Sequence, residues 1–391
     1  MKENNLYKVH IIDEDNIGNG ICKIDDFVVF VKNALIDDVL EIKINKIKKR
    51  YATAEINKIL IPSINRIKPK CKYYKLCGGC SFLHTTYSNE RKIKLQYLEK
   101  LFNTKVNYLE KSNEFNYRNK VVLHVKNDQI GLYNENTHDI CPIDKCLLLD
   151  DKINDKIQEI KRFDLSQIKE IMIRVIGNKI MISVTADSND ITIKNIKCDS
   201  LYINKKLIKG DKYLIDNVND FKFSIYPDSF YQVNNSSMIK IYNEVLRLCR
   251  SGNSLLDLYC GTGTIGIWVH SKFKKITGVE INKESIKNAN INKELNNLNN
   301  INFECNDSKN ITGKYDTIIV DPPRSGLSLE VIDFINSSKA LNVIYVSCNP
   351  STLKRDLDKL YNYEMKEISA CDMFPRTKHV ESLMVLERRN S

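Results

Sequence analysis

A cysteine in the sequence Ser347-Cys348-Asn349-Pro350 follows directly after an apolar run, residues 341–346, that is typical of a strand. It lies downstream of Asp321-Pro322-Pro323-Arg324 and upstream of the carboxylate of Glu381. A thiol can act as a nucleophile and a carboxylate as a proton acceptor. Alone, Cys348 could equally be a buried strand-end residue and Glu381 a surface carboxylate. Their position after the Asp-Pro-Pro-Arg turn favours the chemical roles.

A glycine-rich turn lies further upstream. Residues 255–266, Leu-Leu-Asp-Leu-Tyr-Cys-Gly-Thr-Gly-Thr-Ile-Gly, predict an apolar strand, a tight turn and a helix start. Glycines let the backbone approach a ligand, and a helix N-terminus offers free amides. Glu280 closes the next predicted strand, where a carboxylate can accept the ribose hydroxyls of an adenosine cofactor. These features fit both NAD and S-adenosylmethionine.

The turn Asp321-Pro322-Pro323-Arg324 separates these two cofactors. Two prolines stiffen it at the end of an apolar strand, where doubly wound folds place their chemistry. In methyltransferases that act on bases, such turns meet the target base, whereas a dehydrogenase has no need of one. The sequence therefore favours S-adenosylmethionine.

The chemistry of a pyrimidine base then explains why a cysteine stands at position 348. Carbon 5 of uracil is a poor nucleophile, and addition of the Cys348 thiolate to carbon 6 makes it reactive. The adduct collapses only after a base removes the carbon 5 proton, a role that fits Glu381. Methylation of cytosine carbon 5 uses the same chemistry, but those enzymes usually carry a second cysteine in the active-site motifs, which this turn lacks. A non-catalytic RNA-binding protein of the same fold is the other alternative.

A separate group of cysteines suggests a metal site. Cys71, Cys77 and Cys80 follow the spacing Cys-x5-Cys-x2-Cys, and Cys146 comes much later. Four thiolates can hold zinc or an iron-sulfur cluster, and the spacing does not choose between them. Two further residues compete for the fourth ligand position: Cys141 and His84.

Composition bounds the partner and the compartment. The 391 residues include 60 Lys and Arg against 49 Asp and Glu, a formal charge of +11, which favours a polyanion such as nucleic acid. Abundant Lys, Asn and Ile make part of this charge compositional. The chain opens with no signal-peptide pattern and contains no apolar run of membrane-spanning length, so we expect a cytoplasmic protein.

The predicted elements change character along the chain. Residues 7–60 show short alternating runs typical of a small β-barrel, with a basic run at residues 43–50 next to Tyr51 that suits phosphate contact. Residues 71–226 predict a mainly antiparallel sheet and one evident helix, residues 89–102. From residue 236 onward, helices and apolar strands alternate, which predicts a parallel sheet wrapped by helices.

Together these motifs resemble the 5-methyluridine RNA methyltransferase family, in its branch with a TRAM domain and a four-cysteine iron-sulfur cluster. The sequence Ser229-Phe230-Tyr231-Gln232-Val233-Asn234 resembles the opening of that family's catalytic domain. The resemblance implies a multidomain α/β fold in three parts. These are an N-terminal OB-like TRAM β-barrel (residues 1–62), a central cluster-binding, mainly antiparallel β domain (63–228) and a C-terminal Rossmann-like methyltransferase domain (229–391). A helix over residues 89–112 is expected to pack on the catalytic domain.

The resemblance also assigns roles. It implies that Cys348 is the nucleophile and Glu381 the general base, and that Asp321 and Arg324 bind the uridine. S-adenosylmethionine is expected at Gln232, Tyr259, Glu280 and Asp321, and a [4Fe-4S] cluster, rather than zinc, at Cys71, Cys77, Cys80 and Cys146. The expected substrate is RNA, with 23S ribosomal RNA preferred and transfer RNA the alternative, bound by a monomer. Arg376 departs from the family's usual uncharged residue and is expected to change substrate contacts.

Overall fold

The computed structural model describes residues 1–135 and 137–389. Two compact units divide these residues. The first combines residues 1–104, 133–141 and 374–379, and the second holds residues 105–132, 142–373 and 380–391. Among the described residues, no helix is long and apolar enough to cross a membrane.

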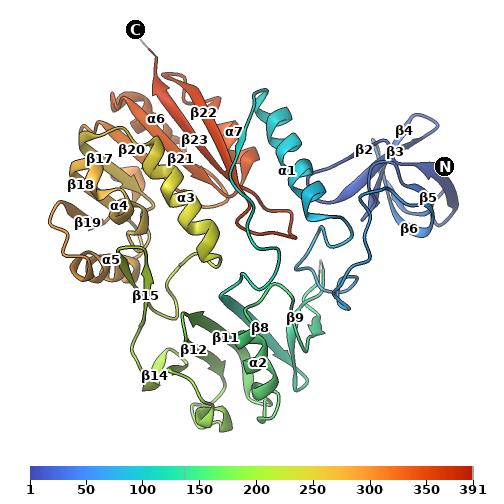
Figure 1. Cartoon of the computed structure of the whole chain (residues 1–391), viewed down its shortest axis with the longest axis horizontal. Coiled ribbons are helices and arrows are strands. Elements are labelled where there is room, and N and C mark those ends of the chain that lie inside the picture. The colour runs from blue at the N-terminus through green and yellow to red at the C-terminus, as the bar shows by residue number, and fades with distance from the viewer. Residues whose placement is uncertain (136, 390–391) are drawn as a thin grey trace. The chain divides into compact units, whose positions relative to one another are not determined.

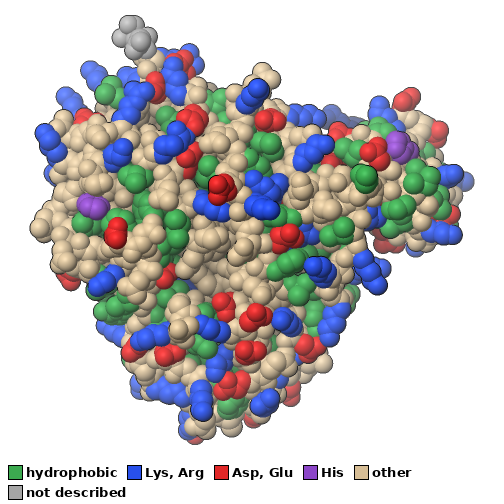
Figure 2. Space-filling view, viewed as in Figure 1, with side chains coloured by type: hydrophobic (Ala, Val, Ile, Leu, Met, Phe, Trp, Pro, Cys, Tyr) green, Lys and Arg blue, Asp and Glu red, His purple; other side chains and the backbone are tan. Residues whose placement is uncertain are grey.

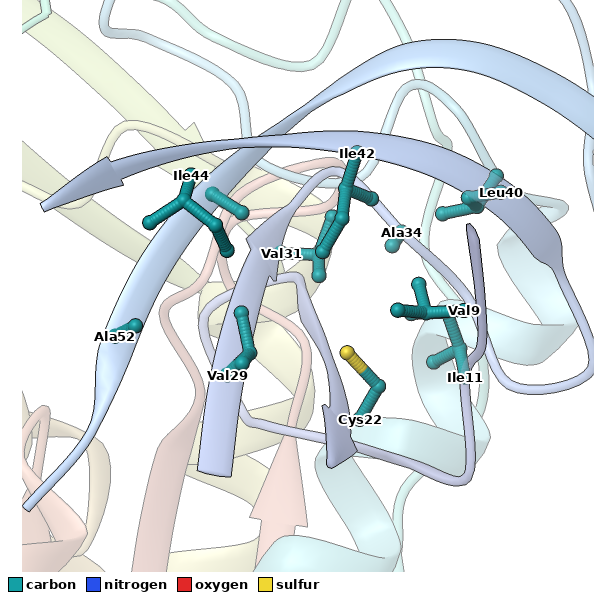
Figure 3. Close-up of a cluster of buried hydrophobic side chains, with 11 residues drawn as sticks. Val9, Ile11, Cys22, Val29, Val31, Ala34, Leu40, Ile42, Ile44 and Ala52 are labelled. Atoms are coloured by element: carbon teal, nitrogen blue, oxygen red, sulfur yellow. The ribbon is translucent and has the colours of Figure 1, made fainter. Parts of the chain in front are cut away.

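A six-stranded sheet opens the first unit, with strand order β1-β5-β6-β4-β3-β2. Its strands are β1 (Leu6–His10), β2 (Asp13–Glu14), β3 (Asn19–Ile24), β4 (Phe27–Lys32), β5 (Val39–Ile47) and β6 (Ala52–Ile61). Alternate residues of these strands point inward, as the period of a strand requires. Their aliphatic side chains enclose a small core in which Cys22 is an ordinary buried residue (Figure 3). The predicted small β domain is therefore present.

One long helix, α1 (Tyr87–Phe102), follows in the same unit. The side chain of Thr86 caps it by accepting the N–H of Asn89, and Asn103 ends it in a left-handed conformation with φ of 51°. The prediction that the helix extends to residue 112 is wrong. Residues 107–108 instead form β7 (Asn107–Tyr108), which pairs in parallel with β22 in the second unit's large sheet. That α1 packs on the catalytic domain stays a prediction.

The second unit contains a seven-stranded sheet of order β10-β9-β8-β11-β12-β13-β14. The pairs β8–β9, β8–β11, β11–β12 and β13–β14 are antiparallel and β12–β13 is parallel, in agreement with the predicted mainly antiparallel sheet. A two-stranded hairpin of β15 and β16 follows. The elements are β8 (Lys120–Lys126), β9 (Gln129–Tyr133), β10 (Ile140–Pro142), α2 (Asp151–Ile160), β11 (Ile168–Ile176), β12 (Lys179–Ala186), η1 (Thr192–Asn195), β13 (Ser200–Ile203), β14 (Lys206–Gly210), β15 (Leu214–Val218) and β16 (Phe221–Ile225).

The same unit ends in an eight-stranded sheet of order β19-β18-β17-β20-β21-β23-β22-β7. Strands β17 to β21 run parallel, and β23 turns back antiparallel between β21 and β22. Helix α3, yellow in Figure 1, contacts β22 and β23. The elements are α3 (Asn235–Leu248), β17 (Gly252–Leu258), α4 (Thr264–Trp268), η2 (His270–Lys272), β18 (Phe273–Glu280), α5 (Lys283–Leu295), β19 (Ile301–Cys305), η3 (Ser308–Asn310), β20 (Thr317–Val320), α6 (Leu329–Ser337), β21 (Asn342–Ser347), α7 (Pro350–Leu357), β22 (Tyr363–Cys371) and β23 (Glu381–Arg388). The predicted parallel sheet wrapped by helices is present.

Candidate active site

The carboxyl ends of three parallel strands meet at one edge of the eight-stranded sheet. Register pairs Leu258 with Val320 and Val320 with Tyr345, so β17, β20 and β21 end at nearly the same level. The residue after each of these ends is one of the predicted site residues, Tyr259, Asp321 or Cys348. Because β23 runs antiparallel and pairs Ser382 with Ser347, its first residue, Glu381, begins at this same edge. The topology therefore gathers residues that are up to 122 positions apart in the sequence.

The glycine turn after β17 is tightly constrained. Tyr259 has a φ of 61° and Gly263 a φ of 77°, both in the left-handed region. A Cβ on Gly263 would lie 2.3 Å from the Phe303 ring, so only glycine fits there. The N–H of Gly266 donates to Oδ2 of Asp257 at 3.0 Å, which ties the start of α4 to the strand. Burial raises the pKa of Asp257 to about 7.

A pocket opens beside this turn, with about 360 Å³ of empty volume including space open to solvent. Three of the predicted cofactor residues line it: Gln232, Tyr259 and Asp321. The sequence analysis did not assign the remaining lining residues: Phe230, Tyr231, Tyr242, Cys260, Gly261, Thr262, Thr264 and Ile265. Most of these stand beside assigned residues in the two motifs at 229–234 and 255–266, so motif adjacency could have found them. Tyr242, on α3, carries no motif and could not be found this way.

The carboxylate of Glu280 makes two hydrogen bonds to main-chain N–H groups. Its carboxylate accepts the N–H of Gly261 at 3.3 Å and the N–H of Asn282 at 2.9 Å. These bonds join the end of β18 to the glycine turn, and the carboxylate lies outside the pocket lining. Its predicted contact with a ribose stays a prediction.

Four ionisable groups influence one another at the ends of β20 and β21. The pKa of Glu381 is raised to about 8, mainly by burial and also by Asp321, while Arg324 acts in the opposite direction. Burial alone raises the pKa of Asp321 to about 7. Burial, Glu381 and Asp321 raise the pKa of the Cys348 thiol, and Arg324 opposes them. Arg324 is thus the group that favours the charged forms of both proposed catalytic residues.

Helix α7, which begins two residues after Cys348, holds the turn that carries Arg324. The main-chain carbonyl of Arg324 accepts hydrogen bonds from Nδ2 of Asn349 at 3.1 Å and Oγ1 of Thr352 at 3.3 Å. The fully buried Asp356 then accepts the N–H of Leu327 at 2.7 Å and the hydroxyl of Tyr345 at 2.8 Å. The nucleophile candidate and the Asp-Pro-Pro-Arg turn therefore share one hydrogen-bonded scaffold.

The cysteines predicted to bind a cluster fall in both units. Cys71, Cys77 and Cys80 belong to the first unit, together with the buried Cys141. Burial raises the pKa of Cys77, and Cys141 and Cys71 add to the effect, so these three thiols lie within electrostatic reach of one another. Cys146 belongs to the second unit, where its N–H donates to Oδ1 of Asn154 at 2.9 Å. In the described part of the chain, no three His, Cys, Asp or Glu side chains are gathered closely enough to hold a metal ion.

Two other residues from the sequence analysis are buried and make hydrogen bonds within the protein. His84 is buried, and its Nδ1 lies 2.7 Å from the hydroxyl of Tyr74. Arg376 is only 1% exposed, and it donates to Oε2 of Glu90 at 3.2 Å and to the carbonyl of Thr85 at 2.8 Å. The expectation that Arg376 contacts substrate is not supported, because its guanidinium is buried against α1.

Sequence comparison relates the whole chain to known proteins. A family model described as tRNA (Uracil-5-)-methyltransferase matches residues 156–315 and 312–389, and a TRAM domain model matches residues 2–56. An uncharacterized RNA methyltransferase of Clostridium acetobutylicum is 34% identical over 99% of this chain and 98% of its own. One from Staphylococcus aureus is 30% identical over 97% of this chain and 98% of its own.

A solved structure is similar over nearly the same extent. It is the Pyrococcus abyssi tRNA (uracil-54, C5)-methyltransferase in complex with S-adenosyl-L-homocysteine. The TM-score is 0.84 at 26% identity, covering 97% of this chain and 100% of that one. The similarity includes the small N-terminal sheet as well as the sheet that carries the candidate site.

Proposed function

The chain belongs to the tRNA (uracil-5-)-methyltransferase family and is an S-adenosylmethionine-dependent RNA methyltransferase, and we propose that it methylates carbon 5 of uridine through a covalent adduct with Cys348. One observation carries the proposal. The Cys348 thiol and the Glu381 carboxylate, whose pKa values are both lowered by Arg324 and raised by Asp321, lie within electrostatic reach of Asp321, which lines the pocket. The chemistry at carbon 5 needs a nucleophile and a base together, and this edge of the sheet supplies both.

The pocket beside the glycine turn fits the methyl donor. S-adenosylmethionine carries a sulfonium cation, and Asp321 and the nearby Asp257 are buried carboxyl groups whose pKa values are raised mainly by burial, so a cation beside them would favour their charged forms. Gln232 and Tyr259 line the same pocket and would hold the donor.

The proposed steps balance in bonds and protons. The Cys348 thiolate forms a bond to carbon 6 of the uracil, and the electron pair gained at carbon 5 takes the methyl group, breaking the sulfur–methyl bond of the donor. Glu381 then accepts the carbon 5 proton, and the bond between carbon 6 and Cys348 breaks, which returns the thiolate. Arg324 favours the ionised forms of both residues, and Asp321 would accept a hydrogen bond from the N3–H of uracil, which cytosine lacks.

The substrate is proposed to be structured RNA, with the uridine turned out of its stack. Ribosomal RNA of the large subunit is the first candidate, on the resemblance to the branch with a TRAM domain and four cysteines. Transfer RNA is the second, because the Pyrococcus abyssi relative matches this chain over 97% of its length and is named for a tRNA uracil.

The decisive test uses RNA carrying tritium at carbon 5 of uridine, separated into ribosomal and transfer RNA pools. Purified protein and S-adenosylmethionine are expected to release tritium to water from one pool. Cys348→Ala is expected to release none, while Cys305→Ala, which removes an exposed thiol, serves as the matched control. Folded protein that binds the donor but releases no tritium from either pool would overturn the proposal.

We further propose that Cys71, Cys77, Cys80 and Cys146 hold a [4Fe-4S] cluster, with zinc as the alternative. The support is the sequence spacing and the electrostatic proximity of Cys71, Cys77 and Cys141. Protein purified without oxygen is expected to be brown and to contain about four iron atoms per chain. Cys146→Ser should lose iron and Cys141→Ser should retain it; the reverse result would make Cys141 the fourth ligand, and stoichiometric zinc would refute the cluster.

A further inference from the structure

Two cations stand directly opposite each other in the seven-stranded sheet. Arg174 on β11 pairs in antiparallel register with Lys120 on β8, so both side chains lie on the same face. Like charges in this arrangement destabilise a sheet. Arg118 adds a third cation, and its Nε donates to the carbonyl of Lys120 at 3.2 Å.

The charge of Arg174 is not balanced locally. The side chain is 1% exposed, yet its guanidinium donates to two main-chain carbonyls, those of Tyr226 at 3.3 Å and Ser229 at 3.0 Å. Its Nε has no hydrogen-bond partner among the described residues. Burying a cation against neutral carbonyls is costly, and an anion nearby would offset that cost.

The surroundings of Lys120 agree with this imbalance. Its pKa is lowered to about 8, mainly by burial and also by Arg174 and Arg118, while Asp228 and Glu170 act in the opposite direction. Glu170 also lies 3.5 Å from Nδ1 of His124. The two acids therefore do not fully offset the effect of the two arginines on the pKa of Lys120.

The three cations are connected to the pocket through a single loop. Arg174 holds the carbonyl of Ser229, and Nδ2 of Asn119, between Arg118 and Lys120, donates to the carbonyl of Gln232 at 3.2 Å. Between these anchors lie Phe230, which is 69% exposed, and Tyr231; together with Gln232 they line the pocket. An anion held by the cations would therefore sit beside the loop that lines the pocket.

We propose that Arg118, Lys120 and Arg174 form an anion site that binds a phosphate of the RNA backbone next to the target nucleotide. Lys120 and Arg118, which are partly exposed, contact the phosphate oxygens, and the buried Arg174 adds positive potential and fixes the loop. The inference rests on RNA being the substrate. On the face that Figure 2 shows, Lys and Arg alternate with Asp and Glu, so the net charge of +11 alone does not direct RNA to one place.

Salt dependence of RNA binding tests this site in the full-length protein. One lost phosphate contact should reduce the slope of log Kd against log salt concentration by about 0.9, which is about a fivefold weaker Kd at 0.15 M salt. This loss is expected for Lys120→Gln. Lys120→Arg should retain the slope, and Lys206→Gln, at an exposed lysine on β14, is the matched control. The melting temperature of Lys120→Gln should not fall, because the substitution removes a repulsion.

The outcomes separate the alternatives. An unchanged salt slope in Lys120→Gln, with wild-type stability, would overturn the site. A weaker Kd for S-adenosylmethionine with an unchanged RNA slope would also overturn it, by assigning the cations to the carboxylate of the donor. A reduced slope in a protein that releases no tritium would support the site and refute the proposed methylation, so the two proposals fail independently.

Discussion

Replacing Glu381 with Gln should stabilise the protein while stopping its reaction. Burial raises the pKa of this carboxyl from 4.5 to about 8, so the folded protein holds the proton more tightly than the unfolded chain does. The stabilisation that comes from the protonated form is complete below pH 4.5 and is lost as the pH rises to 8. A glutamine resembles the protonated acid at every pH and does not lose this stabilisation.

The expected size follows from the pKa. A change from 4.5 to about 8, at about 1.4 kcal/mol for each pKa unit, gives an upper bound of about 5 kcal/mol at pH 8 and above. Near pH 4.5 the two proteins should be almost equally stable. The same substitution removes the proton acceptor, which should slow tritium release by about 10²–10⁴-fold. Methylated RNA should then remain bound to Cys348, since the adduct cannot collapse.

The assay is urea unfolding at pH 5, 7 and 9, followed by a signal from the domain that carries the site. Glu304→Gln, at an exposed position on β19, is the control and should show no growing difference. Denaturing gels of protein incubated with labelled RNA and S-adenosylmethionine report the covalent adduct. If Glu381→Gln is equally or less stable than wild type at pH 9, the carboxylate is not destabilising and the reasoning from burial is wrong.

Further predictions concern the groups around Glu381. Arg324→Gln should shift the rising limb of the pH–rate profile to higher pH, because Arg324 lowers the pKa of both Cys348 and Glu381; a limb at unchanged pH would contradict this. Gly263→Ala should abolish binding of S-adenosylmethionine in calorimetry, because the new Cβ would lie 2.3 Å from the Phe303 ring, whereas wild-type affinity would show that the turn adapts. Asp356→Ala should lower the free energy of unfolding by about 2–4 kcal/mol, because it leaves the buried N–H of Leu327 and hydroxyl of Tyr345 unpaired. A decrease below about 1 kcal/mol would show that other groups hold the turn.

The order of elements and the position of the candidate site residues at strand ends could be predicted from the sequence because they depend on local signals. Glycines at 261 and 263 are needed where the backbone takes positive φ, and polar residues after apolar runs mark strand ends. Once those strands are parallel, their carboxyl ends must share one edge. Cys348 and Asp321 were therefore brought together by topology that the alternation of strands and helices predicts.

Other features depend on contacts that no local pattern reports. The helix predicted to reach residue 112 ends at Phe102, because Asn103 adopts a left-handed conformation and residues 107–108 pair with β22. Register between β8 and β11 places Lys120 opposite Arg174, although 54 positions separate them in the sequence. From its motif, Arg376 was expected to change substrate contacts. Its side chain instead binds Glu90, which lies 286 positions away in the sequence.

The second unit contains two groups of buried ionisable side chains, and each is opposite in charge to the ligand that it is proposed to bind. The buried carboxyl groups of Asp257, Asp321 and Glu381 have raised pKa values, and Asp321, which influences the other two, lines the pocket proposed for a sulfonium cation. Arg174 and Lys120 lie beside the loop that borders the same pocket and are proposed to meet a phosphate. A cation near Glu381 favours the carboxylate that must accept a proton, so binding of the methyl donor would itself prepare the base. In the free protein both groups destabilise the folded state, and each ligand would offset the destabilisation by the group of opposite sign.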